Sequence, residues 1–266
     1  MSTRLKDVPE TLLIPLWARA AESVHPDPII RDDKAVDMIK KIDYDFSKFE
    51  HSWMSQVGVA IRTELLDKST QDFIVRHPKA VIINIGAGLD TRFSRIDNGS
   101  IRWYDLDLPE VIALKKQFFE ENDRYRMIAK SVFDTSWYNE IERAGAAVLI
   151  LAEGILMYFD EEQVKSLFHH LITHFPGAMM LFEMLAPFMV GKSKHHEAVK
   201  KIGGAEFKWG ISNSRVMESW NPHIRIVNEA NYFDYHKKRW RGMRFLAAIS
   251  ILKHRMNNRI VQVQFQ

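Results

Sequence analysis

Residues 81–92 read VIINIGAGLDTR, and this stretch decides the fold. Its first five residues are mostly β-branched and apolar, which is typical of a buried parallel strand. Gly86 and Gly88 follow, and a strand that stops in glycines makes a tight turn whose backbone a ligand can approach closely. The stretch therefore predicts the first strand of a doubly wound α/β sheet, with a dinucleotide or adenosine cofactor at its carboxyl end.

A second predicted strand, residues 101–107, ends in acids (IRWYDLD). Asp107 lies nineteen residues beyond Gly88, close to the spacing of about 20 at which a carboxylate binds the ribose hydroxyls of such a cofactor. Thr91, however, occupies the position of the third glycine in the G-x-G-x-x-G pattern. This departure argues against NAD, and an NAD dehydrogenase is the weakest alternative.

The composition favours one domain, residues 1–266, over two equal ones, because 46% apolar content in 266 residues can bury a substantial core. The 37 basic and 34 acidic residues leave a net charge of +3, too small to require nucleic acid as a partner. The absence of cysteine excludes a disulfide framework and a thiolate metal site. Neither a signal-peptide pattern nor a window of 18 uncharged apolar residues occurs, so we expect a cytoplasmic protein without a membrane partner.

Periodicity along the rest of the chain predicts a seven-stranded sheet that follows a helical N-terminal cap, residues 1–78. Helices are predicted at residues 11–21, 32–42 and 55–75, from 108, after Asp160 with Gln163 in a capping box, and around 240–252; further strands are predicted at residues 125–133, 146–153, 177–186, 224–227 and 259–265. Residues 188–222 lack strand character and lie between two strands at the ligand edge. We interpret them as a lid insertion, called the lid segment below, although a plain loop fits the same pattern.

Several polar residues allow both a functional and a structural interpretation. Glu153 ends a very apolar strand, and because a buried acid is costly without a ligand or a donor, a functional role is favoured. Arg62 lies beside the apolar stripe of its helix, where an arginine commonly covers apolar surface with its stem. His170 and His174 share a helix face, but no HExxH motif or acidic third ligand accompanies them, so no metal site is predicted.

One basic cluster lies near the C-terminus and consists of Lys237, Lys238, Arg239, Arg241 and Arg244. Lys237, Arg241 and Arg244 share a predicted helical face opposite Trp240, which is the usual pattern of a surface helix. A phosphate-binding face is the second interpretation.

A set of motifs spread over nearly the whole chain resembles a known family. The motifs are PETLLIPLWARAAES with PDPII, IRTELLD, NIGAGLDTR, WYDLDLPEVI, SVFDTSW and LAEGILMYF, in this order. Their arrangement resembles class I S-adenosylmethionine (SAM) methyltransferases and, more narrowly, the leucine carboxyl methyltransferase family with its tetracenomycin-type polyketide O-methyltransferases. GAGLDTR followed by DLPEV and AEGILMY is the most specific part of this set.

The resemblance implies cofactor-binding roles for residues at matching positions. Arg62 matches an arginine that binds the carboxylate of the SAM methionine moiety, with Arg19 as a second basic contact, and a guanidinium can grip a carboxylate through two hydrogen bonds. Gly86 matches the glycine against the cofactor, and Asp107 matches the acid on its ribose. Glu153 matches the acid near the methionine amino group, whose positive charge it would favour.

At the adenine end, the resemblance points to Ser131 and Val132. Some relatives have aspartate at the Ser131 position, so the chain departs from the family there, and Asp134 is a candidate for the missing acceptor. Tyr158 matches a tyrosine that faces the substrate.

The resemblance also implies the reaction. We expect an O-methyltransferase that transfers the SAM methyl group to a carboxylate or hydroxyl oxygen of a small molecule, such as a polyketide-like metabolite, and releases S-adenosylhomocysteine. A carboxylate acceptor needs mainly orientation, with its oxygen about 3 to 3.5 Å from the methyl group. A hydroxyl acceptor needs a base, and His195, His196 and His223 are candidates among which the sequence does not choose, so no catalytic residue is named.

Three alternative functions fit the same motifs. They are methylation of a protein C-terminal carboxylate, methylation of an RNA base side chain, and SAM binding without catalysis in the same fold. The short lid segment and the small net charge argue against the first two. Neither the acceptor nor the oligomeric state follows from the sequence.

Overall fold

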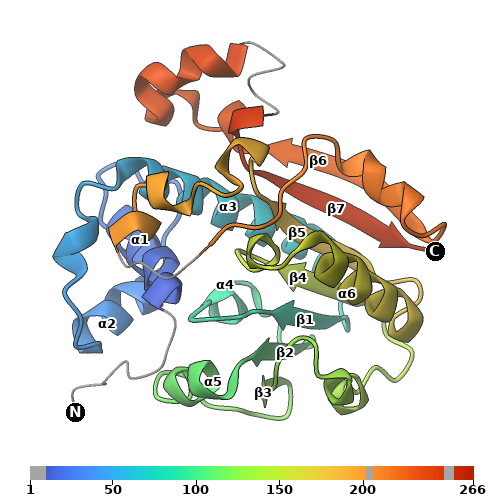
Figure 1. Ribbon diagram of the computed structural model, residues 1–266. Coiled ribbons are helices and arrows are strands. Elements are labelled where there is room, and N and C mark those ends of the chain that lie inside the picture. Colours follow the sequence, from blue (N-terminus) through green and yellow to red (C-terminus); the bar gives the residue numbers. More distant parts are fainter. Residues whose placement is uncertain (1–9, 202–205, 249–254) are drawn as a thin grey trace.

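The computed structural model describes residues 10–201, 206–248 and 255–266, which form one mixed sheet covered by helices (Figure 1). The strands are β1 (Val81–Ile85), β2 (Arg102–Asp107), β3 (Tyr125–Ala129), β4 (Val148–Ala152), β5 (Met179–Met184), β6 (Ile224–Asn231) and β7 (Arg259–Phe265). Their order is β3-β2-β1-β4-β5-β7-β6, with β1 to β5 parallel and β7 antiparallel to both β5 and β6. The order reverses between β1 and β4, which is where open α/β sheets bind ligands at their carboxyl ends.

Helices cover both faces of the sheet. They are α1 (Leu13–Ser23), α2 (Asp33–Lys41), α3 (Trp53–Arg76), α4 (Arg92–Ile96), α5 (Pro109–Lys115) and α6 (Glu161–His174). Alternate residues of β1 point to opposite faces of the sheet and belong to two hydrophobic cores. Ile82 packs in a cluster with α1, α2, α3 and α5, whereas Ile83 packs in a cluster with α6. The predicted capping box of Asp160 and Gln163 is confirmed at the start of α6.

Short 3-10 segments connect the larger elements. They are η1 (Glu10–Leu12), η2 (Phe46–Phe49), η3 (Thr135–Glu140), η4 (Leu156–Tyr158), η5 (Pro187–Met189), η6 (Ser193–His195), η7 (Val199–Lys201), η8 (Ser214–Ser219), η9 (Tyr232–Asp234) and η10 (Lys237–Ala248). In its described part, the lid segment therefore contains 3-10 turns and extended chain. No helix within the described ranges is long and apolar enough to cross a bilayer.

The turn after β1 requires glycine for two reasons. Gly86 has φ +64° and Gly88 has φ +46°, a backbone region that side chains with a Cβ rarely adopt. A Cβ on Gly86 would also lie 2.3 Å from Cδ1 of Ile155, so this residue lets the chain after β4 pack directly on the turn. The glycine pattern thus fixes the contact between β1 and β4 at the ligand edge.

Two predicted strand boundaries are wrong. The strand predicted to reach residue 133 ends at Ala129, because Asp134 turns the chain by capping η3. The strand predicted to end at residue 227 continues to Asn231 past an irregularity in register, because pairing with β7 holds its polar residues in extended form. The helix that begins near residue 108 stops at Lys115, whose Nζ forms a buried ion pair with Asp105 of β2 at 2.6 Å.

The helix predicted around residues 240–252 is present in the described part as a kinked 3-10 segment, and residues 249–252 lie outside the described residues. The η10 segment is interrupted at Arg241, which has φ +50°, so Lys237 and Arg241 do not lie on one regular helix. Burial of Trp240, whose Nε1 donates to two backbone carbonyls, fixes the chain in this irregular form.

A connected set of buried ion pairs joins the turn after β1 to α1, α3 and the ends of β4 and β5. We call it the rim network; its members within the described chain are Arg19, Arg62, Arg92, Arg95, Asp32, Asp67, Asp90, Glu153 and Glu183. Arg92 is fully buried, and its guanidinium lies 2.6 Å from Asp67, 2.7 Å from Asp90 and 2.6 Å from Glu153. A buried cation is tolerated only with such compensation.

Replacing Arg92 by Met should lower the free energy of unfolding by about 3–5 kcal/mol, because three largely buried acids lose the fully buried cation that they share. Arg124→Met is the matched control: Arg124 also lies 2.6 Å from its acid, Asp97, but its side chain is 32% exposed. Its loss should stay below about 1 kcal/mol. Urea unfolding followed by circular dichroism measures both values. Equal losses in the two variants would show that the ion pairs of Arg92 contribute no more to the free energy of unfolding than a partly exposed ion pair does.

Candidate active site

A pocket of about 970 Å³ lies where the carboxyl ends of β1 to β5 meet α1, α3 and the lid segment. It brings together every cofactor and substrate residue predicted from the sequence: Arg19, Arg62, Gly86, Asp107, Ser131, Val132, Glu153 and Tyr158. Asp134, the predicted substitute acceptor, does not line it; its carboxylate instead accepts hydrogen bonds from the backbone and hydroxyl of Ser136. The volume is at the upper end of the usual range for ligand sites, which is enough for more than one small molecule.

Asp107 closes the pocket at the end of β2. Its Oδ2 accepts a hydrogen bond from Gly88 N at 2.7 Å, and its Oδ1 accepts one from Leu108 N at 2.8 Å. Burial raises the pKa of this carboxyl, and the two backbone donors offset only part of that rise. The carboxylate keeps further acceptor sites, since two oxygens can accept about four hydrogen bonds.

Ser131 and Val132 follow β3 and leave the sheet at the same rim. Asp134 N donates to the carbonyl of Ser131, which turns the chain toward the pocket. Val132 is buried, and Phe133 packs edge-on against Phe159 with ring centroids 4.8 Å apart. This part of the pocket therefore offers an apolar wall next to polar backbone groups.

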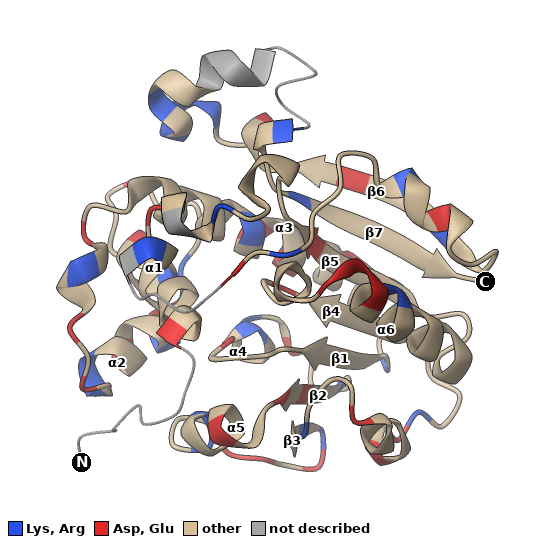
Figure 2. Cartoon of the chain, viewed as in Figure 1, with Lys and Arg blue, Asp and Glu red and all other residues tan. Residues whose placement is uncertain are grey.

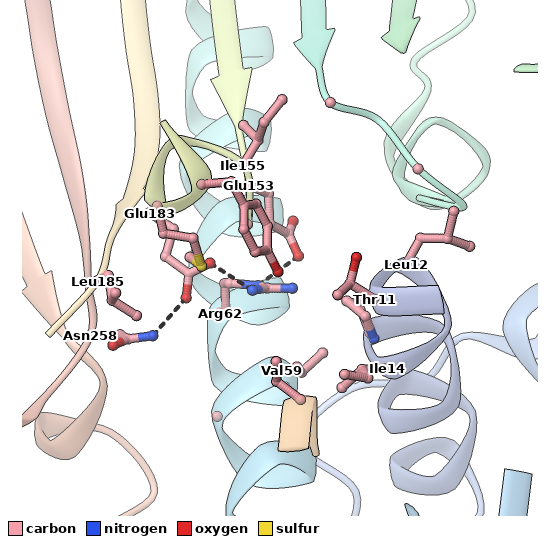
Figure 3. A pocket seen from close by; sticks show the side chains of 18 of the residues that line it. Thr11, Leu12, Ile14, Val59, Arg62, Glu153, Ile155, Glu183, Leu185 and Asn258 are labelled. Carbon is pink, nitrogen blue, oxygen red and sulfur yellow. Dashed lines mark hydrogen bonds and ion pairs between the residues drawn. The ribbon is translucent and has the colours of Figure 1, made fainter. Parts of the chain in front are cut away.

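Glu153 and Arg62 face each other at the end of β4, as Figure 3 shows. Nε of Arg62 lies 2.7 Å from Oε1 of Glu153, and its Nη1 donates to Oε2 of Glu183 at 2.6 Å. Burial alone would raise the pKa of Glu153, but Arg62 and Arg92 outweigh it and lower that pKa, so the carboxylate stays ionised. Both predicted residues are thus already held in buried ion pairs inside the pocket.

Arg19 is similarly engaged on α1. Its Nε donates to Asp32 at 2.8 Å, and its Nη2 donates to the carbonyl of Leu89 at 2.8 Å, so the helix is tied to the glycine turn. The side chain is 4% exposed and lines the pocket. Arg19 therefore lines the pocket, as a second basic contact to the cofactor would, and its two hydrogen bonds fix the orientation of its guanidinium group.

Sequence reasoning missed Glu183 near the end of β5. The side chain is buried, and its Oε1 accepts hydrogen bonds from the Tyr232 hydroxyl and Asn258 Nδ2, each at 3.0 Å. Figure 3 shows the contact between Glu183 and Asn258. An acid inside the apolar run GAMMLFEMLA is the same signal that singled out Glu153, so this residue was detectable. Arg92 and Asp90 were also missed as interacting residues, although both lie within the GAGLDTR motif.

Beyond the rim network, the pocket becomes apolar beneath the lid segment. Its wall here consists of Ile14, Val59, Met157, Leu185, Met189, Val199 and Phe207. Tyr158 lies at this end, with its ring centroid 5.8 Å from that of Phe207. Burial raises the pKa of Tyr158 to about 12, so the phenol stays protonated at neutral pH and can donate a hydrogen bond.

The three histidines considered as bases occupy different places. His195 and His196 line the pocket. His223 does not: it is exposed and precedes β6 beside Gln266, at the opposite edge of the sheet, which excludes it as a base in this pocket. His174 stacks on Tyr138 with centroids 4.1 Å apart, and within the described chain no three or more His, Cys, Asp or Glu residues are grouped to hold a metal ion.

Comparison with known sequences identifies relatives of this chain. Residues 13–172 match the family model described as leucine carboxyl methyltransferase. The tetracenomycin polyketide synthesis O-methyltransferase TcmP of Streptomyces glaucescens is 34% identical over 232 residues, which cover 87% of this chain and 85% of TcmP. The S-adenosyl-L-methionine-dependent methyltransferase dpfgK of Gibberella zeae is 28% identical over 245 residues, covering 81% and 79% of the two chains.

Solved structures share the fold. A DUF574 family protein from Streptomyces avermitilis superposes with a TM-score of 0.58 at 12% identity and covers 94% of this chain and 97% of that chain. Magnesium protoporphyrin IX methyltransferase from Synechocystis gives a TM-score of 0.50 at 11% identity, covering 89% and 99%. The predicted class I methyltransferase fold is confirmed. Because the family model spans more than half of the chain and TcmP matches it over most of both lengths, the chain belongs to the leucine carboxyl methyltransferase family.

Proposed function

We propose that the protein transfers a methyl group from SAM to an oxygen of a small, largely apolar acceptor. The observation that carries this proposal is the composition of one continuous pocket of about 970 Å³. One end is lined by ionised groups that complement SAM, and the other end is an apolar compartment under the lid segment. A methyltransferase needs both compartments, because cofactor and acceptor must meet inside one water-excluding site.

The donor set at the rim fits SAM. Asp107 offers free acceptor capacity for the two ribose hydroxyls, next to the open backbone of the glycine turn. Ser131 and Val132 would border the adenine, whose flat face suits the apolar wall beside them. The name of dpfgK gives S-adenosyl-L-methionine as its methyl donor and TcmP is named as an O-methyltransferase, which supports SAM as the ligand of this end of the pocket.

The methionine end of the cofactor is a zwitterion, and the rim network offers both charges. Glu153 would attract the ammonium group, while Arg62 and Arg19 would attract the carboxylate. Because these three side chains are already fixed by ion pairs, they lose little freedom when the cofactor binds. The network contains five carboxylates and four guanidinium groups, so its excess negative charge favours a sulfonium cation.

SAM supplies an electrophilic sulfonium methyl group: the acceptor oxygen forms the new O–C bond as the C–S bond breaks, and that electron pair stays on sulfur in S-adenosylhomocysteine. The chain contributes placement and exclusion of water. Tyr158 would donate a hydrogen bond to the acceptor rather than take its proton, since its phenol is protonated at neutral pH. An acceptor that is already ionised, such as a carboxylate, therefore suits this pocket best.

The RNA alternative finds little support in the charge distribution. Among the described residues, Lys and Arg are interspersed with Asp and Glu along the ribbon (Figure 2). Of the basic cluster near the C-terminus, Arg239 pairs with Glu22 at 2.8 Å, and Arg241 lies over the ring of Trp53. An electrostatic footprint for nucleic acid needs cations gathered on one face.

Replacing Asp107 by Ala should raise the Kd for SAM at least about tenfold, because two charge-assisted hydrogen bonds to the ribose are lost. Asp134→Ala is the matched control, since Asp134 lies outside the pocket, and its Kd should equal that of the wild type. Isothermal calorimetry measures both, with circular dichroism to verify the fold. Unchanged affinity in Asp107→Ala would remove Asp107 from the cofactor site.

Affinity for SAM should also fall as the pH is lowered, starting above pH 3.8, the ordinary pKa of an aspartate. The pKa of Asp107 is raised, so the ionised form that binds hydroxyls best is present only above that raised value and is lost as the pH falls through it. The pKa of Glu153 is lowered, so Glu153 stays charged in this range. Calorimetry as a function of pH tests this, and an identical slope in Asp107→Ala would assign the effect to another group.

Radiolabelled SAM should transfer its methyl label to an aromatic hydroxy acid such as 3-hydroxy-2-naphthoate, and alkali should release that label. Base-labile label identifies an ester, as expected for a carboxylate acceptor, whereas resistant label would identify an ether. Bulk tRNA and a peptide with a free C-terminal carboxylate serve as the competing acceptors. Binding of SAM without transfer to any of these probes would favour the non-catalytic alternative.

A further inference from the structure

His196, in the lid segment, lines the apolar end of the pocket. Its ring meets Phe207 edge-on, with centroids 5.7 Å apart. The two side chains come from the two described stretches of the lid segment, residues 188–201 and 206–222, so the contact joins these stretches beside the pocket. The contacts proposed for the cofactor do not involve this ring.

The hydrogen bonds of His196 determine its tautomer. The backbone N–H of Val199 donates to Nδ1 at 3.3 Å. A backbone amide can only donate, so Nδ1 carries no proton, and the neutral ring has its proton on Nε2. Burial, together with the charge of Arg62, lowers the pKa of His196 to about 4, so the ring is neutral at physiological pH. No described residue accepts a hydrogen bond from Nε2.

The neighbouring residue anchors this part of the lid segment. Oε2 of Glu197 accepts hydrogen bonds from Met54 N at 3.0 Å and Ser55 N at 3.2 Å, in the first turn of α3. Ser52 precedes this helix without capping it through its side chain, so Glu197 satisfies the exposed amides instead. Because α3 also carries Arg62, the backbone at residue 196 is fixed relative to the rim network.

We infer that His196 is a positioning residue, which donates a hydrogen bond from Nε2 to an oxygen of the methyl acceptor. This inference rests on the proposed function and adds the group that orients the acceptor. With Nδ1 occupied by Val199 and Nε2 already protonated, the ring cannot take a proton from a hydroxyl group. His196 therefore orients an acceptor oxygen and is not the general base.

The tautomer can be observed directly by nuclear magnetic resonance. In protein labelled with ¹⁵N-histidine, long-range ¹H–¹⁵N spectra at pH 7.5 should show His196 with an unprotonated Nδ1 and a protonated Nε2. Comparison with the His196→Gln variant assigns its signals. A ring protonated on Nδ1, or on both nitrogens, would overturn the inference.

Acceptor binding separates hydrogen-bond donation from packing. The fluorescence of 3-hydroxy-2-naphthoate is titrated with protein saturated with S-adenosylhomocysteine. His196→Leu keeps the bulk without a donor and should raise the Kd for naphthoate at least about tenfold. His196→Gln retains an N–H near the position of Nε2 and should restore affinity to within about threefold of the wild type. His223→Gln, at the exposed opposite edge, should bind as the wild type does.

The outcomes distinguish the inference from the function on which it rests. Equal weakening in the Leu and Gln variants, or none in the Leu variant, would overturn the role of His196. Wild-type protein that binds SAM but not naphthoate would also overturn it and would leave the cofactor site intact. Wild-type protein that binds neither molecule would overturn the proposed function itself.

Discussion

The buried guanidinium of Arg92 is the constraint on which the ligand edge depends. It follows the glycine turn and joins Asp67 of α3 to Asp90 of the turn and Glu153 after β4. Three separate segments thereby share one cation, so a movement of any of them would break at least one ion pair in a medium that solvates charge poorly. The turn is rigid for an electrostatic reason, and the direct packing of Ile155 on Gly86 adds a steric one.

This rigidity changes how the cofactor residues act. From the sequence, Arg62 is expected to bind a carboxylate and Glu153 an ammonium group, and each is expected to be unpaired until the ligand binds. In the structure they neutralise each other at 2.7 Å. A zwitterionic ligand then adds its charges to an existing pair, so the site can be assembled before the ligand arrives without the cost of two isolated buried charges. A ligand with only one of these charges would gain less from the same pair.

The sequence predicted the parts of this site that depend on local patterns. Strand periodicity, the glycine turn and the acid at Asp107 are short-range signals, so the sheet and its ligand edge followed from them. The ends of β3 and β6 did not, because a single cap at Asp134 stopped the first, and pairing with β7 extended the second. The irregular chain at Arg241 likewise depends on the burial of Trp240, a tertiary effect that a helical pattern cannot reveal.

The acceptor side was the least predictable for the same physical reason. The lid segment has no periodicity, and the chemistry of its polar groups depends on contacts that no pattern reveals. Glu197 accepts a hydrogen bond from the first turn of α3, and the tautomer of His196 depends on one backbone amide. Methyl transfer from a sulfonium demands little beyond orientation. A change in the lid segment can therefore alter the acceptor pocket without altering the rim network, and the sequence motifs that predict the cofactor side leave the acceptor unspecified.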